Sequence, residues 1–260
     1  MKHPDVFATI VIPPLMLVVS WYFVPIAAWL VVMALFLAFT LLIGKIIVHT
    51  WRGALIDERN KISLARLQAL LWTTLVISAL LVAGVHNARS DKTGPLNITV
   101  PPQLWILLGI IVTSLVGSGL IKQEKGRRTP DRKAAAIALK KREDQIVASG
   151  TQLLKAEGNA EVVANGVLTV NNDPADSRWS DLFANEELGG YGRLDLGKIQ
   201  MFYITVVVVF AYAVALGAVL GTGDGKVTAF PALSDGILVL LGISHTTYLA
   251  AKSVSSTPVS

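Results

Sequence analysis

Cysteine is absent from the 260 residues of the chain. Its absence excludes disulfide frameworks, thiolate metal sites and cysteine nucleophiles. The sequence also lacks an HExxH metal motif, a phosphate-binding or dinucleotide-binding glycine loop, and a Gly-x-Ser-x-Gly nucleophile motif. We therefore predict a protein that is not an enzyme and that has no metal site and no cofactor.

Charge is also scarce, since 16% of the residues are Asp, Glu, Lys or Arg, whereas 53% are hydrophobic and the mean hydropathy is +0.57. A soluble domain of this length cannot bury so much apolar surface, which indicates an integral membrane protein. Six apolar runs are each near the ~20 residues that a bilayer requires. These runs are residues 6–23, 26–44, 64–85, 103–121, 196–220 and 236–251.

The first two runs predict a helical hairpin that turns at Pro25, because one helix over both would be roughly twice as long as the hydrocarbon is thick. A secretory signal peptide is the alternative for residues 1–30, but the flank carries only Lys2 and His3, and no small-residue cleavage site is evident. The interiors of all six runs contain no Asp, Glu, Lys or Arg. This disfavours a proton relay, a voltage sensor and an ion-coupled carrier.

Lysine and arginine are unevenly distributed between the runs. With six spans and the amino terminus inside, 20 of the 23 fall on the inner side, and only Arg89, Lys92 and Lys226 fall outside. The positive-inside rule then predicts an inner (plasma) membrane protein with both termini in the cytoplasm. Basic flanks that face the lipid bilayer also account for the net charge of +5, so no nucleic acid partner is needed.

Two parts of the chain repeat each other. Ser63-Leu-Ala-Arg-Leu-Gln68 corresponds to Asp195-Leu-Gly-Lys-Ile-Gln200, and each opens an apolar run that is followed by a second run containing Leu-Leu-Gly-Ile. A good helix N-cap residue, Ser or Asp, starts each copy. Because both copies enter from the same side, we predict a parallel internal repeat of two helical hairpins, which lowers the expectation of an alternating-access carrier.

Polar residues recur at equivalent positions of the two copies. Arg66 and Lys198 lie in the first helical turn, where we interpret them as anchors in the lipid headgroups. Gln68 and Gln200 lie slightly further into the run, where an amide can bond another helix. Pore lining or contact with a ligand is the alternative interpretation of the two glutamines.

The last run contains Ser244 and His245, where the second copy departs from the first. An ionisable residue inside a span is a functional candidate, and histidine titrates near physiological pH. The structural alternative is a neutral histidine bonded to Thr246, Thr247 or a facing helix. Ser244 would need a catalytic partner from another helix, because neighbouring side chains on a helix point about 100° apart.

Residues 122–194 form a polar insertion between the two copies, too short for a large independent core. A basic, alanine-rich stretch predicts a helix over residues 131–149. A solvated helix or a disordered linker is the alternative there. Asn165-Gly166, between two short apolar runs, predicts a β-hairpin over residues 161–170.

Asp173-Pro174 and Gly189-Gly190 predict the start and the end of a further helix. Its aromatic and acidic side chains are a candidate docking surface for a cytoplasmic protein partner. That surface comprises Trp179, Leu182, Phe183, Glu186 and Glu187. Small residues at helical spacing, notably Ala213, Gly217 and Gly221, would allow close helix packing either within the chain or in a homo-oligomer.

Four segments together resemble a group of bacterial multi-pass inner-membrane proteins. The segments are Leu55–Thr73, Arg178–Phe183, Leu194–Phe202 and Leu240–His245. The likeness extends over about residues 50–252. It implies a bacterial inner-membrane location and carries no activity with it.

The predicted fold class is an all-α membrane protein with six transmembrane helices, a parallel repeat of two hairpins and a small cytoplasmic α+β insertion. The expected segments are residues 1–49, 50–121, 122–194 and 195–260. We predict a non-enzymatic, channel-like or effector component that forms a homo-oligomer. A membrane anchor or scaffold for a cytoplasmic partner is the first alternative, and a small-solute transporter is the second.

Overall fold

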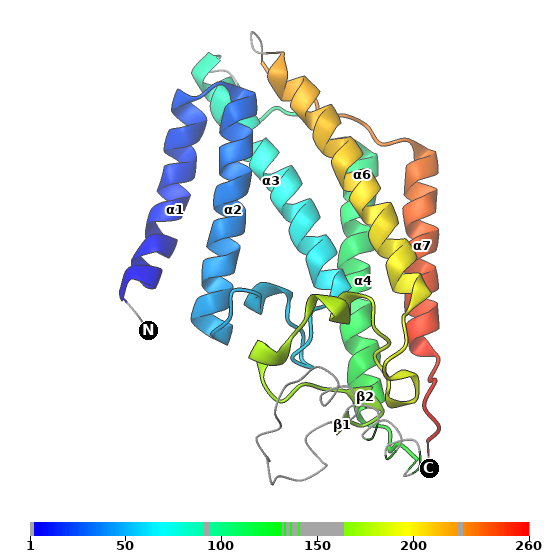
Figure 1. The fold of residues 1–260 in the computed structure, drawn as a ribbon. Coiled ribbons are helices and arrows are strands. Elements are labelled where there is room, and N and C mark those ends of the chain that lie inside the picture. The colour runs from blue at the N-terminus through cyan, green and yellow to red at the C-terminus, as the bar shows by residue number, and fades with distance from the viewer. Residues whose placement is uncertain are drawn as a thin grey trace. The chain divides into compact units, whose positions relative to one another are not determined.

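The computed structural model describes residues 3–90, 94–131, 164–222 and 226–259, together with Lys133, Ala136 and Lys140. Over these residues the chain is mostly helical, with six α-helices and a small two-stranded sheet (Figure 1). The helices are α1 (His3–Tyr22), α2 (Pro25–Val48), α3 (Leu64–Ser90), α4 (Pro102–Gly126), α6 (Leu196–Gly221) and α7 (Asp235–Ser253).

Five of the described helices, α1, α2, α3, α4 and α6, are long and apolar enough to cross a membrane. This fits a multi-pass membrane protein. The sixth, α7, has 19 residues and carries His245, Thr246 and Thr247 in its sequence and Lys252 near its end. These polar residues lower its hydropathy, so a sixth crossing stays a prediction.

The internal repeat is not confirmed, because equivalent residues have different surroundings. Gln68 is buried, whereas Gln200 is exposed. A Cβ atom added to Gly242 would lie 3.9 Å from Ile110, whereas one added to Gly109 would meet no atom within 4 Å. At these two pairs of equivalent positions the surroundings therefore do not match.

The chain forms two compact units, each assembled from distant parts of the sequence. The first unit consists of Met1–Ala54, Leu67–Val112 and Phe202–Ile243. The second consists of Leu55–Arg66, Thr113–Met201 and Ser244–Ser260. The division falls inside α3, α4, α6 and α7, so each of these helices contributes to both units.

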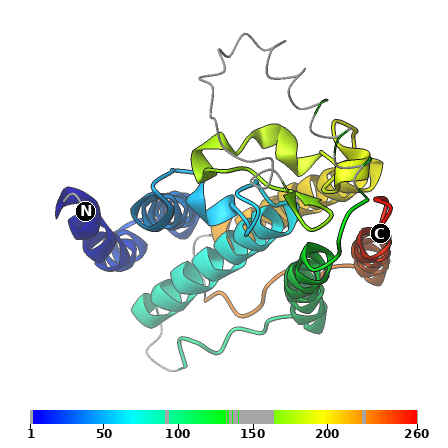
Figure 2. The same ribbon diagram turned by 90° about the horizontal axis from the view of Figure 1, so that it is seen from below.

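The first unit begins with the predicted hairpin, which is confirmed. α1 ends at Tyr22 and α2 starts at Pro25. Proline suits the first position of a helix, because the amide N–H that it lacks would have no partner within the helix there. Figures 1 and 2 both show α1 and α2 side by side. α6 packs close to α2, since Cβ atoms added to Gly217 and Gly221 would lie 3.6 Å from Trp29 and Ile26 respectively. Gly217 and Gly221 of α6 therefore allow close packing within the chain.

Two buried tryptophans in the core of the first unit contact other helices, Trp29 through a hydrogen bond and Trp72 through its ring. Trp29 is buried and donates its indole N–H to Ser78 Oγ at 3.0 Å. The ring of Trp72 lies 5.8 Å from that of Tyr212, whose hydroxyl donates to the carbonyl of Pro231 at 3.1 Å. A buried indole or phenol requires such a partner.

The backbone of α2 and the loop after it approach closely at two glycines. A Cβ on Gly53 would overlap the carbonyl of Gly44, and one on Gly44 would lie 2.8 Å from the nitrogen of Ala54. We expect Gly53→Ala to lower the free energy of unfolding by about 1–3 kcal/mol, because both obstructing groups are backbone. Thermal unfolding in detergent would measure the loss. Gly119→Ala, where a Cβ meets nothing within 4 Å, is the control, and equal midpoints for the two variants would contradict the prediction.

The second unit contains the predicted β-hairpin, which is confirmed. β1 (Ala164–Asn165) pairs antiparallel with β2 (Leu168–Thr169), and Asn165 lies opposite Leu168. The two connecting residues are thus Gly166 and Val167. Gly166 has φ +59°, and a Cβ there would overlap the backbone at the end of α4, so both conformation and space favour glycine.

The helix predicted between Asp173 and Gly190 is wrong. Three short 3₁₀ helices occur instead: η3 (Pro174–Asp176), η4 (Trp179–Leu182) and η5 (Leu188–Gly190). Backbone bridges of Leu168 with Glu187 and of Ala184 with Leu194 take up peptide groups that a continuous helix would need for its own ladder. The helix predicted over residues 131–149 lies mostly outside the described residues.

Candidate functional site

Charged side chains of the second unit are gathered in a buried group. They come from the loop before α3, the end of α4, the segment after η4, the first turn of α6 and the end of α7. Each has a side-chain exposure of 11% or less. We call this group the charge cluster, and it comprises Asp57, Arg59, Lys122, Lys125, Glu186, Glu187, Lys198 and Lys252.

A tight loop before α3 positions the first members of the cluster. Ile56 and Ile62 form a β-bridge, and the amide of Asp57 donates to the carbonyl of Lys61 at 2.9 Å. Asn60 turns the chain in a left-handed conformation, φ +55°, which asparagine tolerates well. Its side-chain amide donates to the carbonyl of Asn171 at 2.8 Å. The loop therefore lies beside the segment that follows β2 (Figure 2).

Asp57 is fully buried and is held by two cations. Arg59 donates from Nε and from a terminal nitrogen to Oδ2, at 3.1 and 2.8 Å, and Lys122 donates to the same oxygen at 2.8 Å. Burial alone would raise the pKa of Asp57, but the charges and hydrogen bonds of Arg59 and Lys122 outweigh it and hold the pKa well below its usual range. Burial likewise opposes the charged form of Arg59, yet Glu186 and Asp57 raise its pKa. Asp57 and Arg59 are therefore both ionised at neutral pH.

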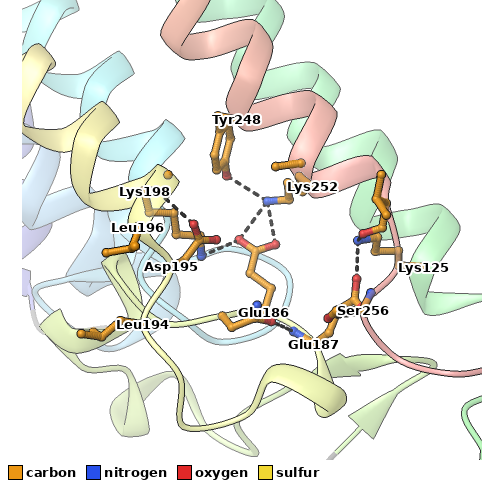
Figure 3. Close-up of a pocket in the computed structure, with 14 residues that line it drawn as sticks. Lys125, Glu186, Glu187, Leu194, Asp195, Leu196, Lys198, Tyr248, Lys252 and Ser256 are labelled. Atoms are coloured by element: carbon orange, nitrogen blue, oxygen red, sulfur yellow. Dashed lines mark hydrogen bonds and ion pairs between the residues drawn. The ribbon is translucent and has the colours of Figure 1, made fainter.

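Glu186 forms ion pairs with three cations of the cluster. Its Oε1 lies 3.0 Å from Lys198 Nζ and 3.3 Å from Arg59, and its Oε2 lies 2.7 Å from Lys252 Nζ. Figure 3 shows the carboxylate directed between Lys198 and Lys252. Burial would raise the pKa of Glu186, but Arg59, Lys198 and Lys252 lower it well below the ordinary value. One carboxylate thus joins α6 and α7 to the loop before α3.

Glu187 connects α4 to the segment after α7. Its Oε1 pairs with Lys125, and its Oε2 accepts the backbone amides of Ser256 and Thr257, each at 2.7 Å. Lys125 also donates to the carbonyl of Val254 at 3.0 Å. Burial would raise the pKa of Glu187, but these donors lower it. Residues 254–257 are therefore held against α4 through one carboxylate and one lysine.

A cavity of about 370 Å³ adjoins the cluster (Figure 3). Its polar lining includes Lys198 and Lys252. Lys252 also donates to Ser118 Oγ at 2.7 Å and to the Tyr248 hydroxyl at 3.0 Å, while Lys198 donates to the carbonyl of Ala184 at 2.8 Å. The apolar lining includes Leu194, Leu196 and Val254, whose exposed fractions are 72%, 75% and 70%.

The residues of the predicted docking surface differ in their exposure and in their contacts. Trp179 is 55% exposed, and Phe183 is half-buried. Leu182 is buried, and Glu186 and Glu187 are occupied by the ion pairs of the cluster. A partner could therefore reach Trp179 but would not meet the two carboxylates as an exposed acidic patch.

The predicted headgroup anchors also differ from each other. Lys198 lies inside the cluster with a side-chain exposure of 4%, whereas Arg66 is half-buried. Among the predicted intramembrane candidates, Gln68 donates from Nε2 to Thr205 Oγ1 of α6 at 2.5 Å. Gln200 is exposed. Gln68 therefore joins two helices, which is the packing role that its position suggested.

Ser244 and His245 are both buried in α7. Within the described residues, His245 Nδ1 and Ser114 Oγ of α4 have no hydrogen-bond partner. The alternative of a neutral histidine bonded to Thr246, Thr247 or a facing helix stays a prediction. An unsatisfied buried nitrogen is unfavourable and keeps His245 a candidate for contact with water or a ligand.

Five members of the cluster were missed from the sequence: Asp57, Arg59, Lys122, Lys125 and Lys252. All five lie at the flanks of apolar runs, where basic residues are expected for topology alone. Asp57 and Arg59 do fall in the motif Leu55–Thr73 that carries the family resemblance. That motif was the one signal that pointed to them.

The described residues include no group of three or more His, Asp or Glu placed to hold a metal ion. The cluster instead offers ammonium groups, a guanidinium group and carboxylates, which can bind charged ligands or exchange ion-pair partners. The chain matches no family model, no curated protein and no solved structure. Its function is therefore argued from the cluster and the cavity.

Proposed function

We propose that the chain is a non-enzymatic effector of the bacterial inner membrane, channel-like in its output, in which the charge cluster couples a cytoplasmic segment to transmembrane helices. One observation supports this most strongly. The consecutive residues Glu186 and Glu187 bind three helix ends, through Lys125 of α4, Lys198 of α6 and Lys252 of α7. A displacement of this short segment would act on all three helices together.

The energetics of buried ion pairs support a switching role more than a purely stabilising one. Desolvation offsets much of the attraction within such pairs, so apolar residues of similar size would stabilise the unit equally well. The ion pairs instead specify one arrangement, and breaking them is costly. A segment whose contacts are either all made or all broken has two discrete states, as an effector requires.

The location in the membrane is part of the same proposal. Five helices apolar enough to span fit it, and the distribution of Lys and Arg favours the side of the cluster as the cytoplasmic side. In this proposal a homo-oligomer forms the conducting path. Chemical cross-linking in membranes would identify the oligomer.

Planar-bilayer recording of the purified protein tests the proposed function. We expect the wild type to conduct, and Glu186→Gln to change the ratio of open to closed states by roughly tenfold or more, since a hydrogen bond to a charged group contributes about 1.5–3 kcal/mol. Glu124→Gln is the matched control, because Glu124 is 61% exposed and lies 3.9 Å from Arg128. A protein that forms oligomers but stays silent at every pH and voltage would contradict the channel-like output.

A scaffold for a cytoplasmic partner is the second candidate function, favoured by the exposure of Trp179 at 55% on η4. Large aromatic side chains are common anchors of protein interfaces. Trp179→Ala should leave the thermal stability unchanged and abolish capture of the partner in a pull-down from membranes. Equal recovery of the same proteins with the wild type and with Trp179→Ala would remove the support for this function.

A further inference from the structure

The charge cluster contains more positive than negative charge. Ion pairs connect three carboxylates, Asp57, Glu58 and Glu186, to four cations, Arg59, Lys122, Lys198 and Lys252. Glu58 is 49% exposed, so water screens its charge. In the described part of the chain, two buried carboxylates are left for four buried cations. Lys125 and Glu187 form a separate, balanced pair.

An unbalanced buried charge is unfavourable, because burial removes the water that would otherwise solvate it. Loss of protons from lysines would reduce the excess charge but would weaken the ion pairs. An anion from outside the chain would also reduce the excess charge and would keep every pair. The excess charge therefore calls for a negatively charged ligand.

The cavity of about 370 Å³ lies where such a ligand would be needed. Lys198 and Lys252 both line it, and Figure 3 shows their ammonium groups directed toward Glu186 beside the open space. Tyr248, whose hydroxyl accepts a hydrogen bond from Lys252, also lines the cavity. Three carboxylates, Glu186, Glu187 and Asp195, and a third lysine, Lys125, also line the cavity. The anion would therefore sit beside Lys198 and Lys252, on the side away from Glu187 and Asp195.

The rim of the cavity is apolar and exposed. Leu194, Leu196 and Val254 are each at least 70% exposed, and Leu196 is the first residue of α6, a helix apolar enough to cross a membrane. A polar cavity that is lined by lysines and carboxylates and has an apolar rim at the start of such a helix suits an amphiphile. Its charged headgroup would lie inside and its acyl chains would lie along the rim.

We propose that this cavity binds a phosphate group carried by an anionic lipid, with Lys198 and Lys252 as its charged ligands. The proposal names a ligand for the cluster on which the effector function rests. A soluble phosphate ester would present the same chemistry to the two lysines but would make no use of the apolar rim.

Thermal unfolding of the full chain tests the ligand. One series replaces chloride with inorganic phosphate in neutral detergent at constant ionic strength, and the other compares nanodiscs of phosphatidylcholine with and without phosphatidylglycerol. We expect phosphatidylglycerol to raise the midpoint and to stay bound in native mass spectrometry. A rise with inorganic phosphate alone would overturn the lipid as the source. No rise in either series would overturn the site.

Variants locate the binding. Lys198→Gln and Lys252→Gln should each weaken the binding of phosphatidylglycerol roughly tenfold, whereas Lys45→Gln, a lysine at the end of α2, should leave it unchanged. Leu196→Ser changes an exposed side chain, so the fold should survive, and it should weaken the lipid but not inorganic phosphate. Wild-type affinity in Lys198→Gln, Lys252→Gln and Leu196→Ser would overturn the proposal. Conductance is not measured, so this proposal and the effector function can fail separately.

Discussion

Glu186→Ala should destabilise the protein by about 3–5 kcal/mol, the cost of removing one partner from a buried ion pair. In the wild type this carboxylate lies within 3.3 Å of Arg59, Lys198 and Lys252. The substitution leaves three buried cations without their common partner, and Arg59 would keep only Asp57, which also binds Lys122. The loss should appear as a lower midpoint in chemical or thermal unfolding of the detergent-solubilised protein.

Two further variants test whether the loss of stability comes from the unpaired cations. Glu124→Ala removes an exposed carboxylate whose contact with Arg128 is 3.9 Å, and surface pairs of this kind contribute about 0–1 kcal/mol. Glu186→Ala with Lys252→Met removes a cation together with the carboxylate, so the double variant should be more stable than Glu186→Ala alone. A Glu186→Ala protein as stable as Glu124→Ala would show that the three cations do not depend on Glu186.

Asp57→Asn should cost a similar amount, about 3–5 kcal/mol at neutral pH, because asparagine keeps the shape of the side chain but not its charge. Arg59 and Lys122 would then be buried beside a neutral amide. Unfolding midpoints of the wild type and Asp57→Asn at pH 7 measure the difference. Asp176→Asn is a suitable control, since it changes an exposed aspartate of η3 that is not a member of the cluster.

The same difference should depend on pH in a definite direction. The pKa of Asp57 is lowered in the folded protein, so its contribution to stability is fully present above the unfolded pKa of about 4. It is lost as the pH falls through the lower, folded pKa. The gap between wild type and Asp57→Asn should stay constant from pH 8 to pH 5 and close only in strong acid. A gap that closes near pH 6 would contradict the assignment.

The parts that could be predicted from the sequence are those that depend on neighbouring residues. The break at Pro25 and the hairpin at Gly166 are confirmed, because a proline and a glycine in an apolar context constrain the local backbone directly. The six helices occur close to the predicted apolar runs, although α7 is not apolar enough to establish a crossing by itself.

The cluster could not be predicted, because it depends on which distant segments meet. Asp57 and Lys122 are 65 positions apart, and Lys125 and Glu187 are 62 positions apart. Each residue alone is typical of a solvated membrane flank. The helix predicted from Asp173 to Gly190 was wrong for a related reason: its caps are local signals, whereas the bridge from Ala184 to Leu194 that replaces helical bonds is made only in the folded unit.

The contact of Glu187 with Ser256 and Thr257 has a consequence for the biogenesis of the protein. A ribosome makes the chain from its amino end, so α4 and Glu187 are synthesised well before residues 254–257 exist. Until then, among the contacts of the described residues, the side chain of Lys125 pairs only with Glu187. Completion of the cluster is therefore a late step of assembly, and a tag fused directly after these residues would meet Glu187 at that step.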